Sequence, residues 1–336
     1  METTRRSIRR HISTGALPEP GIVTDVLERT HRRYGSVEDG NLSSVYPALE
    51  RADPAHFGIA LVGATGSVYE AGDTRVPFSL MSVAKPFVFA LVCDRVGASR
   101  VRELVGVDAT GLPFNSAYAV ERSQHGRTNP MVNAGAIAVT SLLPGTSLER
   151  RWEVLAEGLS LFAGRVLALD DDVLSSARET NLRNRALSLL LAETGALEGD
   201  PFDATDLYTR QSCLSVTATD LAVMGATLAD GGVNPVTGDQ VVSGETARAA
   251  LAVMTVAGLY EASGSWLWDV GLPGKSGIGG GIVTVSPGKG AVGTFSPRLD
   301  AEGNSVRGWL ATRAVAVELG LDILASEPLA QDRKHQ

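Results

Sequence analysis

The chain has 336 residues, of which 44% are apolar and 20% charged, proportions that are ordinary for a globular protein with a sizeable core. The net charge of −8 is not offset by a basic stripe, which argues against nucleic acid as a partner. Five scattered histidines and two cysteines lack the spacing of metal ligands or of a disulfide framework, so no metal site is expected.

The N-terminal segment is basic but lacks the features of a targeting signal. Arg5, Arg6, Arg9 and Arg10 are followed by a short polar segment rather than by an apolar run. We interpret this cluster as a solvated tail and expect residues 1–34 to form a tail and a helix. No stretch approaches the ~18–20 apolar residues of a membrane span. We therefore expect no membrane partner and a cytoplasmic location.

The predicted elements change character twice along the chain. Residues 57–63 and 67–71 are apolar runs joined by a Gly-containing turn, which predicts a strand pair. Apolar residues at helical spacing then dominate, and short Gly-punctuated strands follow near the end. The predicted helices are 82–96, 147–162, 182–194, 217–229, 243–258 and 305–325, and the late strands are 281–286 and 291–295.

Strands near both ends and helices in the middle predict an α/β (α+β) fold. Its antiparallel sheet, flanked by helices, is expected to be built from the two ends of the chain, with an all-helical lobe inserted between them. We expect residues 35–85 and 240–330 to form the α/β subdomain and residues 86–239 the helical subdomain of one catalytic unit.

The sharpest chemical pattern is Ser82-Val-Ala-Lys85. Residues three apart at the start of a helix lie on one face, so a lysine at this spacing can accept the proton of the serine hydroxyl. Apolar neighbours favour the neutral lysine that this role needs, and the N–H groups of the helix suit a developing oxyanion. The structural alternative makes Ser82 an N-cap and Lys85 a solvated helix residue.

A second motif, Lys275-Ser276-Gly277, lies in a Gly-rich segment that runs into a predicted strand. In hydrolases with a Ser-x-x-Lys pair, such a strand edge faces the nucleophile, where its backbone and cation can support an oxyanion or a carboxylate. The rival interpretation is a phosphate-binding loop. That loop requires glycine where Asp269 stands, and a helix after the motif instead of a strand.

With both motifs, the chain resembles the serine-dependent glutaminases, which share the fold of β-lactamases and penicillin-binding proteins. The resemblance runs in order over roughly residues 35–310. The matching segments are Ala71-Gly-Asp-Thr-Arg-Val-Pro-Phe-Ser79, Pro113-Phe-Asn-Ser116, Asn129-Pro-Met-Val-Asn-Ala-Gly-Ala-Ile137, Arg183-Asn-Arg-Ala186, Tyr208-Thr-Arg-Gln211, Gly258-Leu-Tyr-Glu-Ala-Ser-Gly264, residues 271–281, residues 295–300 and residues 303–308.

The resemblance implies a catalytic role for several matching positions. Ser82 would attack the side-chain amide of L-glutamine, with Lys85 as its base. Tyr260 would lie near the nucleophile and help to pass a proton to the departing ammonia. The backbone N–H groups of Ser82 and Ile278 would form the oxyanion hole. No cofactor is implied, and because relatives form dimers or tetramers, a homodimer or homotetramer is expected.

The resemblance also implies that Asn133, Asn184 and Tyr208, together with Ser82, Tyr260 and Ile278, hold the substrate. Each polar residue has a structural alternative. Asn133 could instead be a buried structural asparagine, and Asn184 could lie on a helix surface. Tyr208 and Tyr260 could be half-buried core tyrosines whose hydroxyls are hydrogen-bonded.

Three positions depart from the family pattern. Ala177 stands where a glutamate usually pairs with the substrate α-ammonium, and Met81 stands where a glutamine usually precedes the nucleophile. Val45 stands where a tyrosine is usual, and the next residue, Tyr46, is expected to point away from the nucleophile. Loss of one partner of a buried charge pair typically costs about 2–5 kcal/mol of binding.

Two explanations of these departures stay open. In the first, Glu179 or Glu193 replaces the lost carboxylate. In the second, the substrate has no free α-ammonium, or the protein is a weakly active relative. The sequence thus predicts an amidohydrolase that converts L-glutamine to L-glutamate and ammonia. The alternatives are the same mechanism on another small amide or ester, and a non-catalytic protein that retains the pocket.

Overall fold

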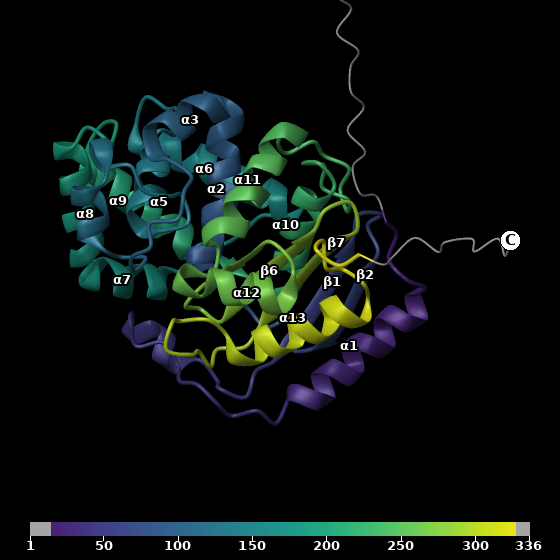
Figure 1. The fold of residues 1–336 in the computed structure, drawn as a ribbon. Coiled ribbons are helices and arrows are strands. Elements are labelled where there is room, and N and C mark those ends of the chain that lie inside the picture. Colours follow the sequence, from purple (N-terminus) through teal and green to yellow (C-terminus); the bar gives the residue numbers. More distant parts are fainter. Residues whose placement is uncertain (1–14, 327–336) are drawn as a thin grey trace, which may run out of the picture.

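A computed structural model of the protein describes residues 15–326 and contains a five-stranded sheet beside a helical region (Figure 1). The strand order is β2-β1-β7-β6-β5, and every neighbouring pair is antiparallel. The strands are β1 Gly58–Gly63, β2 Val68–Gly72, β5 Gly274–Ser276, β6 Gly281–Ser286 and β7 Gly290–Phe295. The predicted antiparallel sheet made from both ends of the chain is therefore confirmed.

Helices cover both faces of this sheet, which explains why β1 is buried along its whole length. Side chains alternate across a strand. Ile59 and Leu61 therefore join a core with α1 (Pro20–Tyr34), α12 (Ser263–Val270) and α13 (Val306–Glu318). Ala60 and Val62 join the larger core with α10 (Ala218–Ala229) and the helical region.

Helix α10 approaches the sheet closely because glycine lies at the contact. A Cβ on Gly293 of β7 would come within 2.2 Å of the Ala218 carbonyl oxygen. A Cβ on Gly225 of α10 would come within 2.6 Å of Ala291. These two positions let the helix backbone lie directly on the strands.

The helical region surrounds α2 (Ala84–Val96), whose residues Ala84–Cys93 are all buried. An apolar helix buried on every side needs neighbours on every side, and α2 packs against α3, α5, α6 and α11. The remaining helices are α3 Ala98–Val105, α4 Ala117–Arg122, α5 Asn133–Ser141, α6 Leu148–Ala163, α7 Asp171–Thr180, α8 Leu182–Glu193, α9 Pro201–Ser212 and α11 Gly244–Ala257.

Most predicted elements agree with the structure, and the differences lie at their ends. The last predicted helix is shorter than expected: α13 ends at Glu318, followed by Gly320 in a left-handed conformation. Helix α10, which falls in the predicted helical subdomain, packs on the sheet. The subdomain boundaries at residues 85 and 240 stay a prediction, and the basic cluster at residues 5–10 lies outside the described residues.

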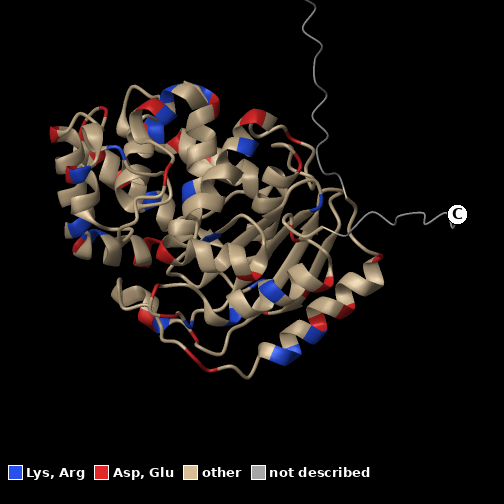
Figure 2. Cartoon of the chain, viewed as in Figure 1, with Lys and Arg blue, Asp and Glu red and all other residues tan. Residues whose placement is uncertain are grey.

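Positions occupied by acidic and by basic residues are spread along the outer helices in the view of Figure 2. Within residues 15–326, no helix combines the length and the apolar character needed to cross a membrane.

Candidate active site

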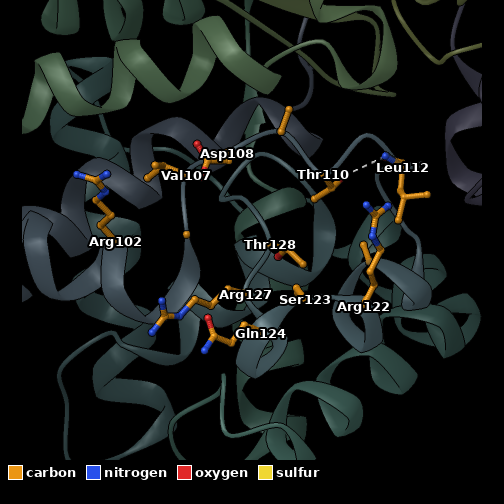
Figure 3. A pocket seen from close by; sticks show the side chains of 13 residues that line it. Arg102, Val107, Asp108, Thr110, Leu112, Arg122, Ser123, Gln124, Arg127 and Thr128 are labelled. Atoms are coloured by element: carbon orange, nitrogen blue, oxygen red, sulfur yellow. Dashed lines mark hydrogen bonds between the residues drawn. The ribbon is translucent and has the colours of Figure 1, made fainter.

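Several hollows lie in the helical region, and two of them differ in character. The larger, about 470 Å³, is lined by Arg102, Arg122 and Arg127, whose guanidinium groups point in different directions (Figure 3). The smaller, about 130 Å³, is lined by Ser82 together with residues from six other segments. The two share no lining residue. The smaller hollow is the candidate active site and is called the Ser82 pocket below.

Ser82 lies in a strained turn between a short strand and the buried helix α2. Strand β3 (Phe78–Ser79) pairs with β4 (Ser215–Val216), and the Leu80 N–H extends this contact to the Leu214 carbonyl at 2.9 Å. A 3₁₀ turn, η2 (Met81–Val83), follows, in which Met81 has a φ of 48°. Non-glycine residues in this conformation cluster at functional sites. Ser82 makes no side-chain capping bond, so the N-cap alternative does not hold.

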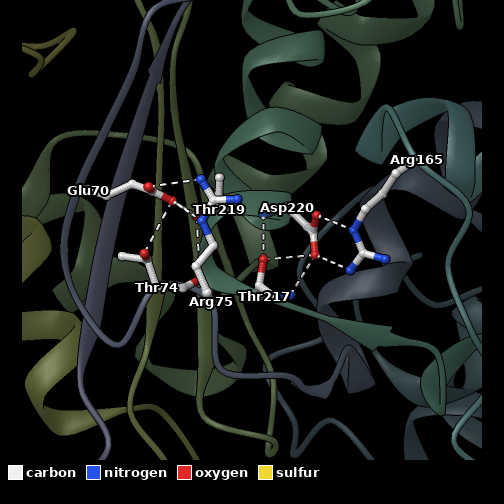
Figure 4. A network of polar contacts seen from close by, with 7 residues as sticks. All are labelled: Glu70, Thr74, Arg75, Arg165, Thr217, Thr219 and Asp220. Atoms are coloured by element: carbon white, nitrogen blue, oxygen red, sulfur yellow. Dashed lines mark hydrogen bonds and ion pairs between the residues drawn. The ribbon is translucent and has the colours of Figure 1, made fainter.

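A polar network lies on either side of the β3–β4 pair that precedes this turn (Figure 4). Glu70 of β2 accepts hydrogen bonds from Thr219 and pairs with Arg75 at 2.7 Å. At the start of α10, Asp220 completes a capping box with Thr217 and pairs with Arg165 through both carboxylate oxygens. These contacts fix the segments that precede β3 and follow β4.

Lys85 lies one turn after Ser82 and is 2% exposed, so the solvated alternative does not hold. Burial lowers its pKa to about 7, because an ammonium ion loses its hydration there. Its Nζ donates a 2.7 Å hydrogen bond to Oδ1 of Asn133. It also lies 5.8 Å and 5.9 Å from the ring centroids of Tyr208 and Tyr260. In the described residues, no direct hydrogen bond joins Lys85 to Ser82.

The two tyrosines flank this lysine. Tyr260 begins the 3₁₀ turn η4 (Tyr260–Ala262) with a φ of 56°, and its hydroxyl donates to the Ser276 carbonyl at 3.3 Å. Burial raises the pKa of Tyr260 to about 12, and interaction with the Ser82 hydroxyl opposes this shift. Burial likewise raises the pKa of Tyr208, whose hydroxyl donates to Asn133 Oδ1 at 3.1 Å. Both phenols are therefore proton donors near the nucleophile.

The Lys275-Ser276-Gly277 motif forms β5 and the first residue after it. Lys275 is fully buried and does not line the Ser82 pocket. Its Nζ donates to the Ser276 carbonyl at 2.6 Å and lies 4.0 Å from the centre of the Tyr260 ring. Burial, together with the nearby Lys85, lowers the pKa of Lys275. The structure thus places this amine against the Tyr260 ring, and its expected support of a carboxylate or an oxyanion stays a prediction.

The backbone after β5 approaches the nucleophile closely. A Cβ on Gly277 would lie 3.2 Å from the Ser82 nitrogen, and one on Gly279 would lie 2.4 Å from the Ser79 carbonyl oxygen. Ile278, between these glycines, lines the pocket. Ser82 and Ile278 therefore line the same hollow, and the oxyanion role expected of their N–H groups stays a prediction.

Asn133, Asn184 and Tyr208 come from three different helices and meet in the pocket. Asn133 is the first residue of α5, Asn184 lies in the first turn of α8, and Tyr208 lies in α9. Nδ2 of Asn133 donates to Oδ1 of Asn184 at 3.0 Å. Asn184 is 6% exposed, so it does not belong to a helix surface.

Sequence reasoning missed Asn181 and Arg183 as pocket residues. Asn181 is 5% exposed and accepts a 2.6 Å hydrogen bond from Asn184. The signal was its spacing, because a residue three before Asn184 lies on the same helix face. Arg183 donates to the Asn115 carbonyl at 2.9 Å.

The three departures from the family pattern lie around this pocket. Ala177 is buried in an apolar cluster with Met81 and Cys213. The expectation that Tyr46 points away is wrong, because Tyr46 lines the pocket beside Val45. A 3₁₀ helix, η1 (Pro47–Arg51), begins immediately after it, and burial raises the pKa of Tyr46 to about 12.

Neither proposed substitute for the missing carboxylate reaches the pocket. Glu179 and Glu193 are both exposed and absent from its lining. Within the described part of the chain, Arg183 is the one charged residue that lines the hollow, and no aspartate or glutamate does. The pocket therefore presents amides, phenols and one guanidinium to a ligand.

Comparison with known proteins agrees with this geometry. A sequence model of the family described as Glutaminase matches residues 40–324. Over 330 residues the chain is 54% identical to Glutaminase 2 of Yersinia pestis, covering 98% of this chain and 97% of that protein.

Solved structures give the same relationship. The structure of a probable glutaminase superposes with a TM-score of 0.90 at 40% identity and covers 92% of this chain and 100% of that one. The L-glutamate-binding form of a protein named Mglu superposes with a TM-score of 0.84 at 38% identity, over 91% of this chain and 68% of that one. The predicted serine-β-lactamase-like fold is confirmed. The chain belongs to the glutaminase family.

Proposed function

We propose that this protein hydrolyses L-glutamine to L-glutamate and ammonia through an acyl-enzyme on Ser82. The observation that carries the proposal is Lys85, which is buried one turn from Ser82 with its pKa lowered to about 7. A lysine in this state is substantially neutral at neutral pH and can act as a base.

Acylation begins with Lys85 taking the hydroxyl proton of Ser82 as Oγ attacks the side-chain amide carbon. The new oxyanion receives hydrogen bonds from the N–H groups of Ser82 and Ile278, and such donors are worth most where charge develops. When the carbon–nitrogen bond breaks, Tyr260 passes a proton to the departing ammonia and is reprotonated from Lys85. The product is a glutamyl ester on Ser82.

Deacylation repeats these steps with water as the nucleophile. Lys85 accepts a proton from the water that attacks the ester carbonyl, and the oxyanion is held as before. Collapse returns the proton to Ser82 Oγ and releases L-glutamate. Asn133, Asn184 and Tyr208 hold the polar ends of the substrate, and the L-glutamate-binding form of Mglu supports a site of this kind.

Ammonia release from millimolar L-glutamine tests the proposal, with Ser82→Ala as the blank. We expect release from the wild type, loss of turnover in Ser82→Ala with the fold intact, and nearly the same loss in Lys85→Ala. Mass spectrometry of quenched wild-type enzyme is expected to show a glutamyl adduct on the Ser82 peptide. Undiminished ammonia release by Ser82→Ala would refute the mechanism.

A second candidate keeps the mechanism and changes the substrate to another small amide or ester. It is favoured by the absence of a carboxylate from the described lining of the pocket, because such a residue would normally pair with an α-ammonium. A third candidate is a regulatory protein that retains the pocket. Formation of any acyl-enzyme on Ser82 separates the first two candidates from the third.

We also propose a homodimer or homotetramer in the cytoplasm, with no nucleic-acid partner. The family resemblance supports the oligomeric assembly, and the net charge of −8 supports the absence of a nucleic-acid partner. Light scattering coupled to size-exclusion chromatography tests the assembly directly.

A further inference from the structure

A line of hydrogen bonds, buried at Thr209 and Asn181 and partly buried at Asn133, runs from the backbone of α9 to the amine of Lys85. The Thr209 hydroxyl donates to the Thr205 carbonyl at 2.7 Å and accepts from Nδ2 of Asn181 at 2.6 Å. Oδ1 of Asn181 accepts from Nδ2 of Asn184 at 2.6 Å, and Oδ1 of Asn184 accepts from Nδ2 of Asn133 at 3.0 Å. We call these four side chains, Thr209, Asn181, Asn184 and Asn133, the amide relay.

The direction of the relay follows from its anchor. A backbone carbonyl can only accept, so the one hydroxyl proton of Thr209 is committed to Thr205. The hydroxyl oxygen of Thr209 can then only accept, which requires Asn181 to present its NH₂ group there. Each carboxamide has its oxygen opposite its nitrogen, so Asn181 presents an oxygen to Asn184.

The same reasoning passes the polarity along the remaining two amides. Asn184 must donate to Asn181 and therefore presents an oxygen to Asn133. Asn133 must donate to Asn184 and therefore presents Oδ1 to Lys85, which donates to it at 2.7 Å, as Tyr208 does at 3.1 Å. All four relay residues lie in or beside the pocket, and Thr209 and Asn181 are 3% and 5% exposed. Water therefore offers little alternative bonding to either of them.

This polarity matters for a lysine that acts as a base. A neutral amine has two N–H donors and one lone pair. An amide oxygen occupies one donor and leaves the lone pair free for the proton of Ser82. If Asn133 were reversed, its NH₂ group would take that lone pair.

We infer that Thr209 and Asn181 are positioning residues that set the direction of Asn133 and thereby keep the lone pair of Lys85 available to Ser82. The inference rests on the proposed function, in which Lys85 is the base. Neither residue contacts the nucleophile in this arrangement. Both act through Asn184 and Asn133.

The test replaces Thr209 with valine, which has nearly the same shape and no hydroxyl. With the anchor gone, Asn181, Asn184 and Asn133 can reverse together. We expect kcat for ammonia release to fall by about tenfold or more, the usual scale of general-base effects. We also expect the acid limb of the pH profile of kcat/KM to move to lower pH, because an NH₂ group facing Lys85 disfavours the ammonium form. Asn181→Leu is expected to act in the same direction.

Two variants serve as controls. Thr209→Ser keeps the hydroxyl and is expected to restore most of kcat and the wild-type pH profile. Thr312→Val removes an equally buried hydroxyl that donates to the carbonyl four residues earlier, at 2.8 Å, in α13. Thr312 lies outside the relay, so its loss reports the structural cost of such a substitution alone. A fall in kcat without movement of the acid limb would reduce Thr209 to a structural role and overturn the inference.

A second measurement keeps the inference testable if L-glutamine is not the substrate. The sequence has four lysines, so NMR titration of ¹³Cε-labelled lysine can follow Lys85 directly, with Lys85→Met to assign its signal. The pKa of Lys85 is expected to fall by about one unit in Thr209→Val and to return in Thr209→Ser. An unchanged pKa in folded Thr209→Val overturns the relay. Lack of ammonia release by the wild type, by contrast, overturns the proposed function alone.

Discussion

Replacement of Lys85 by methionine is expected to abolish activity and to stabilise the fold. Methionine has a similar length and no charge, so it removes the buried amine without leaving a large cavity. The pKa of Lys85 falls from 10.5 to about 7 on folding. This lowering of the pKa means that, below pH 7, the buried amine reduces the unfolding free energy of the wild type by about 5 kcal/mol. The lost hydrogen bond to Asn133 offsets about 1–2 kcal/mol of this gain. The expected net stabilisation near pH 6 is therefore about 3 kcal/mol.

The dependence on pH identifies the cause. Between about pH 7 and pH 10.5 the unfolded wild type binds a proton at residue 85 that the folded protein does not, so wild-type stability rises with pH. The methionine variant lacks this contribution. Its advantage should therefore be greatest below pH 7 and should shrink by up to about 1.4 kcal/mol per pH unit above it.

Urea unfolding of both proteins from pH 6 to pH 9.5 measures this difference, with Lys289→Met on the β6–β7 turn as a control for the substitution itself. Lys289 donates to the Gly320 carbonyl at the surface and is not part of the pocket. A stability difference that stays constant across this pH range would refute a neutral Lys85, as would a variant less stable than the wild type at pH 6.

Three further predictions follow from the pocket and its supports. The acid limb of kcat/KM should lie near pH 7, the pKa of Lys85. Activity at pH 6 should therefore be about a tenth of the plateau value, and a limb below pH 5 would point to another base. Glutaramate lacks the α-ammonium of L-glutamine. Because no described carboxylate lines the pocket, its kcat/KM should be within about tenfold of that for L-glutamine. A much larger preference for L-glutamine would show that an anionic partner for the α-ammonium exists. Asp220→Ala should lower the unfolding free energy in urea by about 2 kcal/mol through loss of the cap and of the pair with Arg165, and a change under about 0.5 kcal/mol would show that neither contributes.

The sequence was informative wherever one local pattern decides the outcome. Alternation and Gly-containing turns located β1, β6 and β7, because each strand is bounded by residues that end it. The Ser82–Lys85 spacing located the candidate nucleophile and the buried amine, because helix geometry alone brings positions three apart together. The apolar run around Lys85 also indicated its burial.

Contacts that depend on how distant segments pack against one another could not be predicted from local sequence patterns. The strand after the Lys275 motif was predicted but β5 itself was not, and which neighbour the Lys275 amine meets depends on how Tyr260 packs against it. Tyr46 lines the pocket, although no local pattern around it predicts this position. Asn181 looked like any polar residue at a helix start until α9 supplied the hydroxyl of Thr209.

The position of β7 between β1 and β6 has a consequence for synthesis of the protein. Ala60 of β1 pairs with Gly293 of β7, so the centre of the sheet closes only after more than two thirds of the chain has left the ribosome. Contacts between residues so far apart in sequence form slowly, because a long loop must be ordered first. Until then β1 presents an unpaired edge, which is a template for association with other chains.

The turn that carries Ser82 also lacks the Gly277–Gly279 backbone against which it packs. A nascent chain that already contains Ser82 and Lys85 therefore lacks this supporting backbone until the Gly277–Gly279 segment has been made.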